Sequence, residues 1–175
     1  MKPVALLLLL SLAPPALLAQ DPRLVGRLDS ATARVVTAVI DSSRELGLPT
    51  EPLVQKALEG ASKSATGDRI IAAVRILALN LGTARTALGR ESSEQELVAG
   101  VAALRAGATP GAIRGLRQAR ASRGVAVPLA VLADLVALGV QVDAAYQSVL
   151  DLARTEADDA AFARLKQQYA GQRQP

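Results

Sequence analysis

The chain contains no cysteine and no histidine among its 175 residues. Without cysteine there can be no disulfide, so packing alone must hold the fold together even in an oxidising compartment. The two absences also remove the commonest general base, the thiolate nucleophile and the usual ligands of zinc and copper. We therefore expect no metal site and no cofactor, and most hydrolase mechanisms are excluded.

Aromatic residues are nearly absent as well, since the sequence has one phenylalanine, two tyrosines and no tryptophan. Leucine, valine, isoleucine and especially alanine must then fill the core, and alanine-rich contacts imply closely packed helices with shallow grooves between them. Few aromatic rings are left to stack sugars in a cleft between two carboxylates, which disfavours a glycosidase.

Two local patterns could support catalysis, and each has a simpler structural explanation. The tripeptide Ser62–Ser64 places serine beside lysine, as in a serine and lysine dyad, but it falls in a predicted turn. Glu156, Asp158 and Asp159 form the densest acidic cluster, at a predicted helix start where acidic residues complement the helix dipole. The chain has neither a glycine-rich phosphate loop nor a calcium loop. We expect no enzyme, and a carboxylate-dependent enzyme is the most distant alternative.

The N-terminus is typical of a secretory signal peptide. Lys2 precedes an apolar run over 4–13, a proline pair follows, and Ala19 offers a small residue at a cleavage point. The alternative, an uncleaved membrane anchor, is disfavoured because the apolar run is short of the about 20 residues that span a bilayer. The sequence thus predicts a signal peptide over 1–19 and a periplasmic or secreted protein with no membrane span after its removal.

The remaining chain predicts one all-α domain over 20–170 and a polar tail over 171–175. Sixteen of the twenty basic residues are arginine. Arginine-rich composition can reflect phosphate recognition, because the guanidinium binds oxyanions bidentately. We favour a G+C-rich coding bias of a bacterial kind, since the small positive excess is far from the charge of nucleic-acid binders.

The stretch 125–140 is the candidate core helix, because it is apolar on all sides except at Asp134. Pro128 suits a first helical turn and Gly139 suits the left-handed position after the last one, which predicts a helix over 128–138. Seven further amphipathic segments have helical spacing of apolar residues, and no segment has the alternation of a strand. These seven are expected over 28–46, from Thr50 to near Gly60, from Thr66 or Asp68 to Leu88, from a Ser92-Ser93 capping box to Arg105, from Thr109-Pro110 to near Gly124, from Asp143 past Leu152, and around Ala160–Leu165.

A weak internal repeat accompanies this pattern. Units starting at Gly47, Ser64, Gly107, Gly124 and Gly139 each begin with a small residue, cross a short turn and enter a helix. Such units build stacks in which each buries its apolar face on its neighbours, although the spacings match no common repeat period. The fold class is therefore all-α, with about seven to eight short helices in an irregular helical-repeat stack or a bundle, and both remain open.

Five arginines lie in an acid-free stretch between Leu97 and Ala133. They are Arg105, Arg114, Arg117, Arg120 and Arg123. A positive patch here could bind an anionic ligand or polymer. The alternative, which we favour, is a helix face neutralised by acids from elsewhere, notably Glu91, Glu94, Glu96 or Asp134, because steps of three residues spread the arginines around the helix.

Asp134 and Asn80 are the polar residues that the apolar segments could bury. A buried Asp134 would need a donor, most simply an arginine of the preceding helix or free backbone N–H groups; otherwise it lies on the thinnest exposed strip of its helix. Taken together, the sequence predicts an exported interaction or structural module whose partner is another protein or an envelope component. An anion binder centred on residues 105–123 is the alternative.

Overall fold

The computed structural model describes residues 21–171, and this range is helical without a strand. The all-α fold class predicted from sequence is confirmed. The predicted signal peptide and residues 172–175 of the predicted tail lie outside the described residues, and Gly171 belongs to the last helix. The elements are η1 (Pro22–Leu24), α1 (Ser30–Glu45), α2 (Glu51–Ser62), α3 (Gly67–Leu88), α4 (Glu94–Arg105), α5 (Pro110–Ala119), α6 (Ala126–Ala137), α7 (Val142–Arg154) and α8 (Asp159–Gly171).

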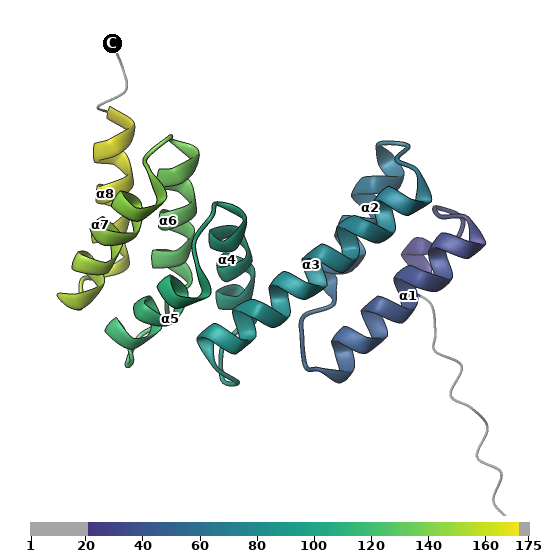
Figure 1. Cartoon of the computed structure of the whole chain (residues 1–175), viewed down its shortest axis with the longest axis horizontal. Coiled ribbons are helices and arrows are strands. Elements are labelled where there is room, and N and C mark those ends of the chain that lie inside the picture. Colours follow the sequence, from purple (N-terminus) through teal and green to yellow (C-terminus); the bar gives the residue numbers. More distant parts are fainter. Residues whose placement is uncertain (1–20, 172–175) are drawn as a thin grey trace, which may run out of the picture.

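The helices follow one another along the longest axis of the molecule, from α1 and α2 at one end to α7 and α8 at the other (Figure 1). Each odd-numbered helix packs on the next odd-numbered one, from α1 through α3 and α5 to α7. The helices α4, α6 and α8 pack on one another in the same way. This pairing of alternate helices is the arrangement of a helical-repeat stack. Of the two architectures left open by the sequence, the structure favours the open stack.

Local signals in the sequence fix where several helices begin. Asp29 caps α1 by accepting hydrogen bonds from the backbone N–H groups of Ala31 and Thr32, both at 3.0 Å. The predicted capping box of α4 is present, with Ser93 and Glu96 bonding each other's backbone N–H groups. The 3-10 helix η1 is an element that the sequence analysis missed, although its Leu24 is fully buried.

The predicted core helix corresponds to α6, which begins at Ala126, two residues earlier than expected, and ends at Ala137. Gly139 has a φ of +79°, so it takes the predicted left-handed position after the helix. The helix packs between α4, α7 and α8. It buries five apolar side chains, namely Pro128, Leu129, Val131, Leu132 and Leu135.

Helix α5 is shorter than the sequence analysis predicted. It ends at Ala119 instead of near Gly124, because Arg120 leaves the helical region with φ −125° and ψ 52°. The side chain of Arg117 donates hydrogen bonds to the carbonyl oxygens of Arg120 and Arg123, so it satisfies acceptors that lie beyond the end of the helix.

Helix α3 is the longest of the described helices and joins the first two helices to the middle of the stack, since it packs on α1 and α2 on one side and on α4 and α5 on the other. By length and composition it could cross a membrane, with a mean hydropathy of 1.3 over 18 residues, and core helices of soluble proteins pass the same test. Only 28% of that window is buried. Apolar side chains of α3 are therefore left exposed within residues 21–171.

Candidate functional site

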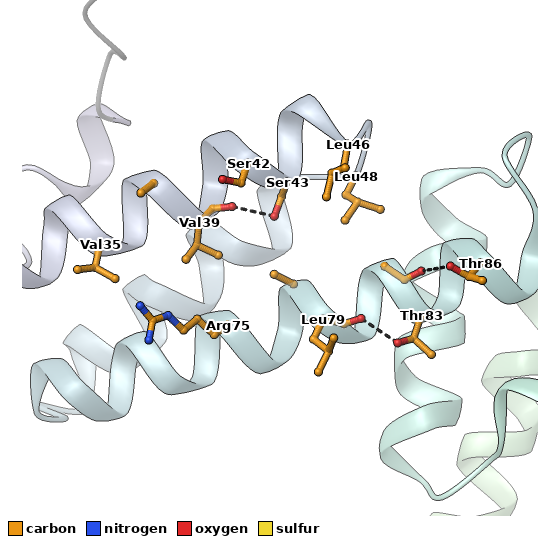
Figure 2. Close-up of a pocket in the computed structure, with 13 residues that line it drawn as sticks. Val35, Val39, Ser42, Ser43, Leu46, Leu48, Arg75, Leu79, Thr83 and Thr86 are labelled. Atoms are coloured by element: carbon orange, nitrogen blue, oxygen red, sulfur yellow. Dashed lines mark hydrogen bonds between the residues drawn. The ribbon is translucent and has the colours of Figure 1, made fainter.

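An apolar groove of about 660 Å³ lies between α1 and α3. We call it the α1–α3 groove (Figure 2). The two helices run in the same direction along it, with Val35 and Arg75 at one end and Leu46, Leu48 and Thr86 at the other. Its lining consists of Val35, Ala38, Val39, Ser42, Ser43, Leu46, Leu48, Arg75, Ala78, Leu79, Gly82, Thr83 and Thr86.

Large apolar side chains project from both rims of the α1–α3 groove. Leu46 on the α1 side is 73% exposed, and Leu79 on the α3 side is 70% exposed. Single exposed leucines are ordinary, but two of them on opposite rims of one hollow form a contiguous apolar surface of the kind that marks an interaction site.

The hydroxyl groups of the groove offer little to a polar ligand. The Thr83 hydroxyl donates to the carbonyl of Leu79 and the Thr86 hydroxyl to that of Gly82, both at 3.0 Å. Ser43 likewise donates to the Val39 carbonyl at 2.8 Å. Each of these three hydroxyls thus bonds the carbonyl four residues back on its own helix, whereas the hydroxyl of exposed Ser42 has no hydrogen-bond partner within residues 21–171. The lining is consequently more apolar than its residue names suggest.

The floor of the groove is hollow because small residues stand where longer side chains could fit. Ala38 belongs to α1 and Ala78 and Gly82 to α3. A Cβ added to Gly82 would meet no atom within 4 Å. The space above Gly82 is therefore open, and a side chain from another molecule can enter it.

Charged residues lie at or beside the two ends of the groove. Arg75 is the charged residue of the lining, and it has no ion-pair or hydrogen-bond partner among residues 21–171. Glu45 is exposed at the opposite end, directly before Leu46, and also lacks such a partner within the described range. It follows Ala38 by seven residues, which places both on the same face of α1. Arg75 therefore makes one end of the groove positive, while Glu45 lies next to the lining at the other end.

The end of the groove near Thr86 is held in place by Arg85. Its guanidinium donates to the carbonyl of Gly47 at 2.9 Å and to that of Ser92 at 3.0 Å. These carbonyls belong to the turn after α1 and the turn before α4. One side chain thus fixes the position of the first helix pair relative to α3 and keeps the groove open.

Three of the five arginines that the sequence analysis singled out are committed to contacts inside the fold. Arg117 pairs with Glu96 at 2.9 Å. Arg120 is 4% exposed, pairs with Asp159 at 3.3 Å and lies over the Phe162 ring at 5.0 Å from its centroid. Arg123 donates to backbone carbonyls that precede α8. We expected acids from elsewhere in the chain to neutralise these arginines, and Glu96, one of the acids named, does pair with Arg117. Asp159, which pairs with Arg120, was not among the acids named.

Glu96 connects three helices through one carboxylate. Besides the capping box and Arg117, its Oε1 accepts a hydrogen bond from the Val125 backbone N–H at 3.0 Å, just before α6. Burial acts to raise the pKa of Glu96, but the N–H donors of Val125 and Ser93 and the charge of Arg117 outweigh it, so the pKa is lowered. This carboxylate is consequently a structural anion and is ionised at neutral pH.

The remaining two arginines lie elsewhere. Arg114 is exposed on α5. Arg105 and Asn80 come together, with Lys56, in a second, smaller groove of about 220 Å³ on the other side of α3. Asn80 is partly exposed there, so the expectation that it is buried was wrong. The five arginines thus do not form one surface.

Asp134 is also not buried, which corrects the other buried-polar prediction. Its side chain is 44% exposed and pairs with Lys166 of α8 at 2.7 Å. From the sequence, Asp134 could lie on an exposed strip or be buried beside a donor, either an arginine of the preceding helix or free backbone N–H groups. The structure places Asp134 on an exposed strip of α6, because Ala130 and Ala137 on either side of it are exposed too.

The two patterns considered for catalysis have structural roles in this geometry. Lys63 pairs with Glu59 at 2.6 Å, while the Ser62 hydroxyl donates to the Glu59 carbonyl. Asp158 accepts a hydrogen bond from the Ala161 backbone N–H at the start of α8. Within residues 21–171 no three acidic residues gather closely enough to hold a metal ion.

The α1–α3 groove itself was not predicted from sequence. A signal was present, since Leu79, Thr83 and Thr86 follow one another at spacings of four and three on a helix already apolar on its other faces. The chain matches no protein-family model, no curated protein and no solved structure.

Proposed function

We propose that this protein is a helical-repeat interaction module that binds an amphipathic helix of a protein partner in the α1–α3 groove. The observation that carries the proposal is the apolar groove itself, with Leu46 and Leu79 projecting from its rims. Helices bind to such grooves through aliphatic side chains spaced at i, i+3, i+4 and i+7.

The chemistry of the lining supports a binding role over catalysis. Burying apolar surface contributes about 25 cal/mol per Å², and a side chain that covers Leu46 or Leu79 removes such surface from water. Three of the four hydroxyls that line the groove, those of Ser43, Thr83 and Thr86, are bonded to helix carbonyls. Arg75 would select a partner helix with an acidic residue near one end.

The place of action that we propose is outside the cytoplasm, in the periplasm or beyond the cell, with an envelope component or another exported protein as partner. The features of residues 1–19 support it. The anion-binding alternative has less support, because Arg117 is paired with Glu96 and Arg123 donates to a backbone carbonyl, although the buried Nε and Nη1 of Arg120 have no hydrogen-bond partner within residues 21–171.

Photo-crosslinking tests the proposal. The full chain carries a benzophenone amino acid in place of Leu79, or in place of exposed Ala130 on α6 as the control, and is irradiated in the cells that produce it. We expect a discrete protein adduct from position 79 and none from position 130. The adduct should map to a helix with aliphatic residues at the spacing given above.

A blocking variant makes the test specific to the groove. Gly82→Glu places a charged side chain in the open space above α3 without a clash at its Cβ. It should abolish the adduct from position 79 while the far-ultraviolet circular dichroism is unchanged. An adduct of the same yield in Gly82→Glu, or no adduct from position 79, would show that the groove binds no protein.

A further inference from the structure

A separate cavity of about 670 Å³ lies where the N-termini of α4, α6 and α8 converge. Its lining includes Glu96 of α4, Ala126 and Val127 of α6, Asp159 of α8, and Arg120 from the turn after α5. We call it the Arg120 cavity, and its volume is in the range of about 300 to 1,000 Å³ that small-molecule sites have. We infer that it binds a small molecule with a carboxylate beside an ammonium group, as in a free α-amino acid.

The guanidinium of Arg120 has donors without acceptors in the wall of this cavity. The side chain is 3% exposed, and its Nε and Nη1 have no hydrogen-bond partner within residues 21–171. Its Nη2 donates to Asp159 at 3.3 Å, which is long beside the about 2.7 to 2.9 Å of a bond between two charged groups. Buried donors without acceptors are costly. The carboxylate of a ligand supplies the missing acceptors.

A ligand can reach this guanidinium because its present partner is replaceable. The side chain of Asp159 is 63% exposed, so it can turn toward solvent when another carboxylate takes its place on Nη2. Protein atoms cover Nε and Nη1. A bidentate contact therefore requires the guanidinium to slide along the Phe162 ring toward the cavity, and it keeps the stabilising contact with that ring as it moves.

The start of α6 adds donors for the same carboxylate. No side chain caps this helix, whereas Ser93 caps α4. Ala126 and Val127 are its first two residues and line the cavity, and the N–H groups of a first helical turn have no acceptor inside the helix. A helix N-terminus also carries about half a positive charge and is a ready site for an anion. Arg120 and α6 thus offer two kinds of donor to one anionic group.

The acids of the cavity favour a ligand that also carries a positive charge. The lining combines two arginines with three acids, of which Glu96 is already paired with Arg117. The other two, Asp158 and Asp159, have side chains 69% and 63% exposed. These carboxylates repel a simple anion and attract an ammonium group. Because Asp159 contacts Arg120 directly, the two charges of the ligand must be close neighbours, as they are in an α-amino acid.

Thermal unfolding of the purified full chain tests the inference. Each standard L-amino acid is added separately at about 10 mM. At least one should raise the melting temperature by about 3 °C or more, because a ligand that binds the folded state alone stabilises it. If no amino acid raises the melting temperature, the inference is overturned.

Calorimetry with the amino acid of largest effect tests the need for both charges. The corresponding carboxylic acid without the amino group, and the amine without the carboxyl group, should each bind at least about tenfold more weakly, because each loses one charged contact. A carboxylic acid that binds as tightly as the amino acid would show that the acids of the cavity contribute nothing, and the inference would then be wrong.

Two variants locate the binding in the Arg120 cavity. Arg120→Met keeps the packing on Phe162 and should weaken binding of the amino acid at least about tenfold. Asp159→Asn should reduce the preference for the amino acid over its carboxylic acid at least about threefold, because the ammonium group loses a charged partner. Circular dichroism checks that both variants fold. An unchanged affinity in Arg120→Met, or an unchanged preference in Asp159→Asn, would overturn the site.

Two controls accompany these variants. Asp151→Asn on α7 removes an exposed acid that pairs with an arginine, as Asp159 does, and should leave binding unchanged. Gly82→Glu should also leave it unchanged, because the Arg120 cavity and the α1–α3 groove share no lining residue. Failure of the amino-acid site consequently leaves the proposed function intact, and failure of the groove leaves this site intact.

Discussion

Replacing Glu96 with glutamine should destabilise this protein more than its small change in size suggests. The carboxylate of Glu96 accepts from Ser93 N–H, Val125 N–H and Arg117 at distances of 2.9 to 3.0 Å. Glutamine keeps one oxygen but presents an NH₂ group in place of the other. That group faces donors, so at least one buried N–H loses its acceptor and Arg117 loses its counter-charge.

The expected magnitude follows from those two losses. A buried donor left without an acceptor costs about 1 to 3 kcal/mol. Removing one partner of a buried ion pair costs about 3 to 5 kcal/mol, and Arg117 is partly exposed, which reduces this term. We expect Glu96→Gln to lower the free energy of unfolding by about 2 to 4 kcal/mol. With a urea slope of about 2 kcal/mol/M, the midpoint should fall by roughly 1 to 2 M.

The assay is urea denaturation followed by circular dichroism at 222 nm, at several pH values. Because the pKa of Glu96 is lowered in the folded protein, its contribution is present above the unfolded pKa and is lost as the pH falls through the folded pKa. The difference between wild type and Glu96→Gln should therefore be largest near neutral pH and shrink below about pH 4. Glu94→Gln, exposed in the same helical turn, is the control.

A Glu96→Gln midpoint equal to that of Glu94→Gln at pH 7 would refute this reasoning. So would a difference between wild type and Glu96→Gln that stays constant down to pH 3, because it would then not depend on the charge of the carboxylate.

Three further substitutions test the description of the fold by the same denaturation assay. Asp134→Ala should change the free energy of unfolding by no more than about 0.5 kcal/mol, because its pair with Lys166 is exposed on both sides; a loss above 3 kcal/mol would mean that Asp134 is buried. Arg120→Met should be tolerated within about 1 kcal/mol, since Met keeps packing on Phe162, whereas Arg120→Ala should cost about 2 to 4 kcal/mol; equal effects would show that packing is not its role. Gly82→Ala should stabilise the protein by about 0.5 to 1 kcal/mol, because it raises helix propensity in open space; destabilisation would mean that the groove is filled in the isolated protein.

The sequence predicted those parts of the fold that depend on nearby residues. The start of α3 after Thr66, the Ser93–Glu96 capping box and the left-handed Gly139 are each decided within one helical turn. The prediction that α5 ends near Gly124 was wrong, because the end of this helix depends on the position of the Arg117 side chain. That position is set by Glu96, 21 residues earlier, and not by local propensity.

The site depends on how distant helices are placed, and this is why the sequence did not reveal it. Leu46 and Leu79 look like ordinary members of two amphipathic helices, and only the packing of α1 on α3 leaves both uncovered. In the same way, the acid that meets Arg120 is Asp159, 39 residues later in the chain. Helical periodicity identifies an apolar face, but it does not tell which part of that face a neighbour covers.

The serial packing of alternate helices also has a kinetic consequence. Each helix contacts only near neighbours in sequence, so few contacts have to close a long loop, and such chains fold quickly for their size. A stack of this kind can also open from its ends without unfolding as a whole. Helix α8 fully buries Phe162 and adds the partly buried Leu165 and Tyr169 and a few ionic contacts, so its amide hydrogens should exchange before those of α6, which buries five apolar side chains. The end of the stack that bears α8 can therefore open and close while the α1–α3 face, at the other end, keeps its shape.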